Sequence, residues 1–331
     1  MTCAEKIDLS QSPPRPYDSL WVKRQTGHSV WPLDFSMGGR PDMNRSQTST
    51  EQCLRAYEEF NERALRLGLG DLSKYLWYHT IELGQNLVTP GVFDFRASLP
   101  CFQFPEDMHG MAVLDVGAAT GFFAFEFERR GASVVATELP SLEALDRFPG
   151  QTVEQSVQKM KDMFLPDSAG RLKAMLAEYT SEELYYYLLE GPFDLCRRFL
   201  GSNVTRCFST VYDLSERKLG MAGFDLVFMG DILLHTLNPL QALATVAPLC
   251  RKKLILSQVM PPAVDGQPAM LYVGGEDPDR DEISWWRPNI LCLVQMLKKL
   301  GFRDVVEVGH HSGVLKSFGY VYDCPILHAT K

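Results

Sequence analysis

The sequence predicts an α/β fold built on a doubly wound, mostly parallel Rossmann-like sheet, and three observations support that prediction. Beyond residue 110, short apolar runs alternate with segments of helix length. One of these runs ends in a glycine-rich turn at residues 117–121. The 331 residues are 45% hydrophobic and 22% charged, as in ordinary globular proteins, which excludes a disordered, collagen-like or coiled-coil chain.

The first 105 residues read as an N-terminal extension that caps the active site. Residues 1–50 are rich in Pro, Ser, Gly and Asn and predict an irregular arm, which the apolar patch at residues 31–35 could anchor. Leu54, Tyr57 and Phe60 fall near helical spacing and predict a helix over residues 51–67. Residues 77–91 predict a strand or loop closed by a turn.

The remaining part, residues 106–331, predicts a single nucleotide-binding domain. Two expected helices cover residues 122–130 and 286–300. Residues 150–205 do not fit the alternation, because three apolar faces at helical spacing follow one another there; they predict a helical insertion that acts as a lid or an oligomer contact. Strands are expected at residues 111–116, 133–137, 208–212, 224–229, 253–259, 305–308 and 326–329.

Charge and cysteine usage narrow the class of protein. The formal charge of −8 argues against a chain that coats nucleic acid with a broad basic face. The 8 cysteines form no C-x-x-C pair and no zinc spacing, so we expect reduced thiols and no metal. No secretory signal and no apolar run of about 18 residues is present, so we expect a cytoplasmic protein without a membrane span.

The most informative segment is V-L-D-V-G-A-A-T-G-F, residues 113–122. A strand ends at Gly117 and a helix begins near Gly121, so the free N–H groups of the helix N-terminus face a ligand. Glu138 follows about 20 residues later at the end of the next strand, where a carboxylate can accept both hydroxyls of a ribose. The spacing misses the G-x-G-x-x-G of dinucleotide folds, which leaves a nicotinamide dehydrogenase as a remote alternative.

Preceded by V-L-D-V, this loop resembles motif I of class I S-adenosylmethionine-dependent methyltransferases. The resemblance implies that the loop lies under the methionine part of the cofactor and that the acid after the second strand holds the ribose. Ser209–Asp213 resembles the position that contacts adenine, and residues 224–231 resemble the strand that ends beside the sulfonium methyl. The implied cofactor-binding residues are Asp115, Gly117, Ala118, Ala119, Thr120, Gly121, Glu138, Leu139, Tyr212, Asp213, Met229 and Gly230.

A narrower resemblance concerns the bacterial tRNA wobble-uridine carboxymethyltransferases. It rests on W-Y-H-T-I-E-L and T-P-G-V-F-D-F-R ahead of motif I, and on F-M-G-D-I-L-L-H, L-N-P and W-W-R-P-N after it. That group recognises a carboxylated cofactor through cationic and hydroxyl side chains. Here Tyr78, His79 and Thr80 stand where a lysine is expected, and residues 313–320 contain no arginine. Plain methyl transfer is therefore expected.

Methyl transfer is an in-line displacement, so the protein mainly aligns acceptor and cofactor. His235 is a candidate base or a histidine bonded to a carbonyl, and His79 has a similar status. Asp231 either orients the acceptor or caps the following helix. Candidate substrate contacts, each with packing or surface pairing as the alternative, are Tyr78, Arg96, Tyr186, Trp286 and Arg287.

The leading hypothesis is an S-adenosylmethionine-dependent methyltransferase that acts at O, N or S of a small-molecule acceptor. A monomer and a homo-oligomer are both open. An RNA methyl- or carboxymethyltransferase is the alternative, although basic residues occur only in short groups such as 129–130, 197–198 and 251–253. A cofactor-binding scaffold without catalysis is a third hypothesis, from another class.

Overall fold

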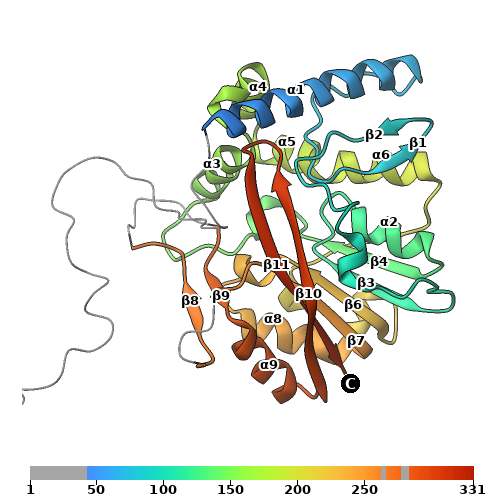
Figure 1. The fold of residues 1–331 in the computed structure, drawn as a ribbon, viewed down its shortest axis with the longest axis vertical. Helices are drawn as coiled ribbons and strands as arrows, with labels where there is room; N and C mark the ends of the chain where they lie inside the picture. The colour runs from blue at the N-terminus through green and yellow to red at the C-terminus, as the bar shows by residue number, and fades with distance from the viewer. Residues whose placement is uncertain (1–42, 262–265, 277–282) are drawn as a thin grey trace, which may run out of the picture. The chain divides into compact units, whose positions relative to one another are not determined.

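The computed structural model describes residues 43–261, 266–276 and 283–331, so residues 1–42 of the predicted arm, with the apolar patch at residues 31–35, lie outside the described residues. Residues 43–50, predicted as the end of the irregular arm, are helical instead. Within these residues a seven-stranded sheet has the order β10-β11-β7-β6-β3-β4-β5 (Figure 1). The strands β3, β4, β5, β6 and β7 run parallel, and the β10–β11 hairpin joins β7 in antiparallel fashion. Their bounds are β3 Ala112–Val116, β4 Ser133–Glu138, β5 Thr205–Phe208, β6 Phe224–Gly230, β7 Cys250–Ser257, β10 Asp304–Leu315 and β11 Tyr320–Thr330. The expected α/β fold is confirmed.

The sheet is covered on both faces, because neighbouring residues of each central strand enter different cores. Val113 packs with the phenylalanines of α2 (Phe122–Arg129) and with α6 (Gly191–Leu200). Leu114 packs on the opposite face with α8 (Pro239–Val246) and α9 (Ile290–Lys299). Strands that are buried on both sides read as continuous apolar runs, which is why the sequence revealed them.

The order of the strands defines where a ligand binds. From β3 the chain moves outward to β4 and β5, then returns to place β6 on the other side of β3. The strand order therefore reverses between β3 and β6. In open α/β sheets the crevice beyond the carboxyl ends of the strands at such a point receives the ligand.

Two predicted elements are wrong. Residues 208–212 are not a strand: β5 ends at Phe208, and Val211–Asp213 form a 3₁₀ turn. This edge strand, T-R-C-F, is only partly buried, so its sequence lacks the apolar run that marks a buried strand. The last long helix begins at Ile290 and not at Trp286, because Asn289 caps it and Trp286–Pro288 form strand β9, paired with β8 (Met270–Tyr272).

The described part of the N-terminal extension shares a hydrophobic core with α2 and α6 on one face of the sheet. Helix α1 spans Met43–Arg66 and is longer than expected, and the short strands β1 (Glu82–Gly84) and β2 (Leu87–Val88) form the turn-closed segment that follows. The hairpin β10–β11 is also longer than expected, and its tip reaches α1. There Ser49 donates to the Lys316 carbonyl at 2.7 Å, and Thr50 donates to the Ser317 carbonyl at 2.9 Å.

The predicted insertion is helical throughout its ordered segments. It contains α3 (Val153–Phe164), α4 (Arg171–Glu178), α5 (Ser181–Tyr185), a π-helical turn at Tyr186–Glu190 and then α6. Capping boxes at Thr152 with Gln155 and at Thr180 with Glu183 begin two of these helices. The short helix α7 (Glu216–Leu219) lies between β5 and β6. No helix in the described ranges is both long and apolar enough to cross a membrane.

Candidate functional site

The glycine-rich loop lies between the carboxyl end of β3 and the start of α2, and neighbouring elements fix its backbone. Gly117 has a φ of +70°, and an added Cβ would stand 2.1 Å from Cδ1 of Ile232. The Ala118 amide donates to the Thr137 carbonyl at 2.9 Å, and Gly121 donates to Ala118 at 2.8 Å. The loop is therefore a tight turn that needs glycine at position 117.

Ala119 is held in a left-handed conformation, with a φ of +46°, which a residue with a Cβ adopts only at a cost. Its amide donates to Oε2 of Glu138 at 2.8 Å. The other oxygen of Glu138 accepts the amide of Leu139 at 3.0 Å. The carboxylate at the end of β4 is thus joined directly to the glycine-rich loop.

The two acids under this loop are poorly solvated. Burial raises the pKa of Glu138, against the opposing effect of Arg206 and of the two backbone amides. Burial also raises the pKa of Asp115, to about 7, although Arg206 acts in the opposite direction. In the described part of the chain, Oδ2 of Asp115 has no hydrogen-bond partner.

Arg206, on β5, is the site residue that the sequence analysis missed. Its side chain is only 8% exposed, and Nη2 lies 3.9 Å from Oε2 of Glu138. The same nitrogen donates to the Ala119 carbonyl at 2.9 Å and to Oε1 of Glu190 at 2.7 Å. No sequence signal indicated it, because its partners lie 87 and 16 residues away along the chain.

The remaining predicted cofactor residues lie at the carboxyl ends of neighbouring strands. Thr120 is buried and accepts the backbone amide of His79 at 3.1 Å. Met229 is buried at the end of β6, directly before Gly230. Asp213 is exposed and accepts the Thr210 hydroxyl at 2.8 Å. The Tyr212 hydroxyl donates to Asp146 and accepts the amide of Asn238 at 3.2 Å, so this tyrosine joins three segments.

Asp231 follows β6 with a φ of +52°, and it does not cap the next helix. Its Oδ1 instead accepts the amide of Val259 at 3.3 Å, just beyond β7. Burial raises the pKa of Asp231 to about 6, while the Val259 amide and the charge of Arg287 act in the opposite direction. The carboxylate therefore lies beside Gly230 at the switch point, which is the place between β3 and β6 where the strand order reverses. The charge of Arg287 acts on it there.

His235 lies in the 3₁₀ turn Leu233–His235 and uses Nδ1 to bond the Ile283 carbonyl at 2.6 Å. A carbonyl only accepts, so Nδ1 carries the proton and Nε2 has a lone pair. Burial lowers the pKa of His235, and the Arg287 charge lowers it further. The imidazole is neutral near neutral pH, bonded to a carbonyl, and still has an unprotonated nitrogen.

His79 lies inside an aromatic cluster. Its ring contacts Tyr78, Phe95, Phe122 and Phe123. Nδ1 accepts the first amide of α2, from Phe122, at 3.5 Å, and burial lowers the pKa of His79 to about 3. This geometry favours the packing alternative for His79. Burial raises the pKa of Tyr78 beside it, and the charges of Asp231 and Glu138 raise it further.

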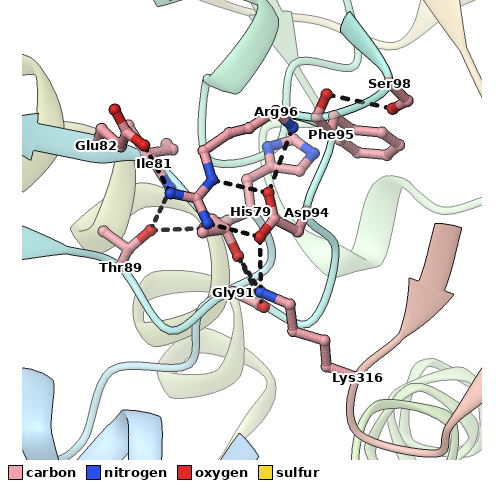
Figure 2. Close-up of polar contacts among 11 residues, drawn as sticks. His79, Ile81, Glu82, Thr89, Gly91, Asp94, Phe95, Arg96, Ser98 and Lys316 are labelled. Atoms are coloured by element: carbon pink, nitrogen blue, oxygen red, sulfur yellow. Dashed lines mark hydrogen bonds and ion pairs between the residues drawn. The ribbon is translucent and has the colours of Figure 1, made fainter.

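Arg96 belongs to a separate group that we name the Asp94 cluster: Glu82, Asp94, Arg96 and Lys316. Figure 2 shows the guanidinium of Arg96 between Asp94 and Glu82. Lys316, at the tip of the β10–β11 hairpin, donates to Oδ2 of Asp94 at 3.0 Å and to the Thr80 hydroxyl at 2.9 Å. Arg96 is therefore engaged in surface ion pairs, which favours the surface-pairing alternative over a substrate contact.

The other candidate substrate contacts lie in two places. Tyr186, in the π-helical turn, is 49% exposed and packs edge-on against Tyr75. Trp286 donates its indole N–H to the Leu237 carbonyl at 3.1 Å. Arg287, next to it on β9, is half-buried and acts electrostatically on Asp231, His235 and Cys324. Arg287 therefore belongs with the acids and imidazole at the switch point.

The described residues contain no group of three or more His, Cys, Asp or Glu side chains that could hold a metal ion. Their seven cysteines are free thiols, of which Cys53, Cys196, Cys250 and Cys324 are buried.

No family model and no curated protein matches the chain. Among solved structures it is similar to the N-terminal domain of EvdMO1 with SAH bound, at 16% identity and a TM-score of 0.47, over 83% of this chain and 97% of that one. It is also similar to magnesium protoporphyrin IX methyltransferase (ChlM) from Synechocystis PCC 6803 with bound SAH, at 15% identity and a TM-score of 0.35, over 68% and 75% of the chains. A third is 1,6-didemethyltoxoflavin-N1-methyltransferase from Burkholderia thailandensis, at 16% identity and a TM-score of 0.39, over 67% and 72%.

Proposed function

We propose that the chain is an S-adenosylmethionine-dependent methyltransferase that moves a methyl group to O, N or S of a small-molecule acceptor. The observation that supports this most is the hydrogen bond between Glu138 and the glycine-rich loop, in which the Ala119 amide donates to the carboxylate at 2.8 Å. It lies at the carboxyl ends of β3 and β4, next to the point where the strand order reverses.

The residues fit an adenosine-type cofactor. Each oxygen of Glu138 already accepts one backbone amide, and a carboxylate oxygen has room for a second donor. Two acceptor positions therefore remain for the vicinal hydroxyls of a ribose. Asp115, Gly117, Ala118 and Thr120 lie in or beside the loop that would lie along the rest of the cofactor.

The same loop disfavours a dinucleotide. A dinucleotide fold places its pyrophosphate on the free amides at the helix N-terminus. Here the Phe122 amide faces Nδ1 of His79, and the Gly121 amide donates to the Ala118 carbonyl. Two of the amides that would receive a pyrophosphate are thus already bonded.

The acceptor end is assigned to Asp231, His235, Arg287 and Tyr78. When bound, the cofactor supplies an electrophilic methyl carbon. The protein must orient the acceptor atom toward it and remove a proton where the acceptor starts protonated. His235 can take that proton at Nε2, because its Nδ1–H is held by Ile283. Arg287 can hold an anionic group of the acceptor, and Asp231 can orient a donor group.

The short basic groups at residues 129–130, 197–198 and 251–253 give little support to an RNA-binding face. Arg129 and Arg130 pair with Glu126, Arg197 and Arg198 pair with Asp194, and Arg251 and Lys252 pair with Asp225. A cation that already faces a carboxylate contributes less to phosphate binding. A small acceptor is therefore favoured over RNA.

The N-terminal extension is proposed to form part of the site. His79 donates its backbone amide to Thr120 in the glycine-rich loop, so the segment that carries Tyr78 lies directly on that loop. We propose that residues 106–331 form one cofactor-binding domain, that this extension caps it, and that the helical insertion closes over the acceptor.

Calorimetric titration near neutral pH tests the cofactor assignment. S-adenosylmethionine and S-adenosylhomocysteine should bind, and NAD should not. Binding of NAD alone would overturn the proposal. Incubation with methyl-labelled S-adenosylmethionine and total tRNA tests the acceptor class: incorporation of label into the tRNA would exclude a small molecule as the main acceptor.

A further inference from the structure

The buried arginine on β5 has more contacts than its place in the sheet requires. Nη2 of Arg206 donates to the Ala119 carbonyl and to Glu190, and Nε donates to the same Glu190 oxygen at 3.3 Å. The guanidinium carbon stands 4.1 Å from the centre of the Phe193 ring. Among the described residues, Nη1 is buried without a partner. A buried charge with incomplete pairing is costly, so a purely structural explanation is weak.

The Ala119 peptide shows what these contacts achieve. Its amide is held by Glu138 and its carbonyl by Arg206, at 2.8 and 2.9 Å. A left-handed alanine persists only where its surroundings over-determine it. Two side chains from two different strands fix this residue in the middle of the glycine-rich loop.

The helical insertion contacts two neighbours of Glu138, namely Arg206 and the following residue Leu139. Glu190, which holds Arg206, is the last residue of the π-helical turn Tyr186–Glu190. Tyr185, just before that turn, donates its hydroxyl to the Leu139 carbonyl at 2.6 Å. Single π-helical turns are rare and occur frequently at functional sites.

We propose that Arg206 is a positioning residue for the cofactor: it fixes the Ala119 carbonyl, balances the charge of Glu138, and couples both through Glu190 to the helical insertion. This inference rests on the proposed function for the identity of the ligand. The electrostatic part concerns the chain alone and can be measured without any ligand.

The charges of Arg206 and Glu190 are expected to shift the pKa of Glu138 in opposite directions. Burial raises the pKa of Glu138, Arg206 lowers it and Glu190 raises it. Removal of the Arg206 charge should therefore raise the pKa of Glu138, whereas removal of the Glu190 charge should lower it. Opposite shifts show that both charges act on Glu138, and the ligand titration below separates a positioning role from a purely structural one. The titratable and charged groups that face Glu138 are Arg206, Glu190, Asp115, Tyr78 and Tyr185.

The test is a carbon-13 NMR titration of the Glu138 carboxyl in the ligand-free full chain. Arg206→Met should raise the midpoint by roughly one pH unit or more, because an opposite charge nearby shifts a carboxyl pKa by that amount. Glu190→Gln should lower it, and Arg206→Lys should bring it back toward the wild type. Arg130→Met is the matched control, since Arg130 also bonds a carboxylate, Glu126, and the carbonyl of Pro105. It should leave the midpoint unchanged.

Titration with S-adenosylhomocysteine at acidic and alkaline pH measures how Arg206 affects the binding of the ligand. Arg206→Met should weaken binding roughly tenfold or more at acidic pH, and less at alkaline pH, because a larger fraction of Glu138 is then protonated at acidic pH. Arg206→Lys should recover the pH profile without the full affinity, because lysine restores the charge but not the planar fork.

An unchanged Glu138 midpoint in folded Arg206→Met would overturn the inference. If Arg206→Met does not fold, the downward shift in Glu190→Gln decides the question, and its absence overturns the inference. If the wild type binds no S-adenosylhomocysteine, the proposed function fails, yet the ligand-free midpoints still decide the role of Arg206.

Discussion

Two arginines of this chain each meet a pair of carboxylates, and the difference between them separates the candidate site from the scaffold. Arg206 bonds Glu190 at 2.7 Å and stands near Glu138, with 8% of its side chain exposed. Arg96 bonds Glu82 at 2.7 Å and Asp94 at 2.8 Å, with 39% of its side chain exposed. The shortest contact of each arginine is alike, but Arg206 stays 3.9 Å from Glu138, whereas Arg96 bonds Asp94 directly. The two clusters therefore differ in burial and in how closely the second carboxylate is paired.

The carboxyl groups respond in opposite ways. Burial raises the pKa of Glu138, and Arg206 offsets only part of that. Burial would also raise the pKa of Asp94, but hydrogen bonds from Arg96 and Lys316 outweigh it and lower the pKa to about 2. Asp94 is thus stabilised in its charged form by two direct partners, whereas Glu138 stays poorly solvated, which is typical of carboxyl groups at functional sites.

The largest effect is expected from Gly117→Val, which should abolish cofactor binding. Its φ of +70° excludes a β-branched residue, and the new Cβ would meet Ile232. Calorimetry with S-adenosylmethionine measures the loss. Gly220→Ala is a control at another left-handed glycine, with a φ of +67° and no atom within 4 Å of an added Cβ. Unchanged affinity in Gly117→Val would contradict the placement of the site.

The next effect is expected from Glu138→Gln. The amide cannot accept hydrogen bonds at both of its ends, and it lacks the charge that strengthens them, so affinity for S-adenosylmethionine should fall roughly 10- to 100-fold. Glu82→Gln in the Asp94 cluster is the comparison and should leave the affinity as it is. Equal losses in both variants would show that the two clusters do not differ as argued here.

The sequence predicted the glycine-rich loop and Glu138 because their signals are local. The loop is a continuous run of small residues between an apolar strand and a helix, and Glu138 ends the next apolar run. These features follow from the conformational needs of a tight turn and from burial of both faces of a parallel strand. The sheet's central strands were predictable for the same reason.

What the sequence did not reveal depends on distant partners. The edge strand that carries Arg206 is partly exposed, so no apolar run marked it and the strand was placed three residues too late. Lys316 and Asp94 are 222 residues apart along the chain, and only the long β10–β11 hairpin brings them together. Pairings of charged side chains across such separations leave no periodic pattern in the sequence.

Asp94→Asn should change stability and not binding. The folded pKa of about 2 lies below the unfolded value of about 4, so Asp94 stabilises the fold above that value, and the contribution is lost as pH falls from about 4 to 2. Near neutral pH we expect a loss of about 1 kcal/mol, since the group is partly exposed and screened. Urea denaturation across this pH range measures it. If the free energy of unfolding of Asp94→Asn falls between about pH 4 and pH 2 as steeply as that of the wild type, other groups cause the acid sensitivity.

The smallest effect is expected from Arg96→Gln, and it tests the comparison most finely. Asp94 keeps Lys316 as a partner at 3.0 Å when Arg96 is replaced, and Glu82 is 67% exposed and is solvated by water instead. The free energy of unfolding should therefore change by no more than about 0.5 kcal/mol, as for most surface substitutions. Affinity for S-adenosylmethionine should stay the same, in contrast to Arg206→Met. If Arg96→Gln weakens cofactor binding as strongly as Arg206→Met, burial is not what distinguishes the two arginines, and the Asp94 cluster belongs to the site.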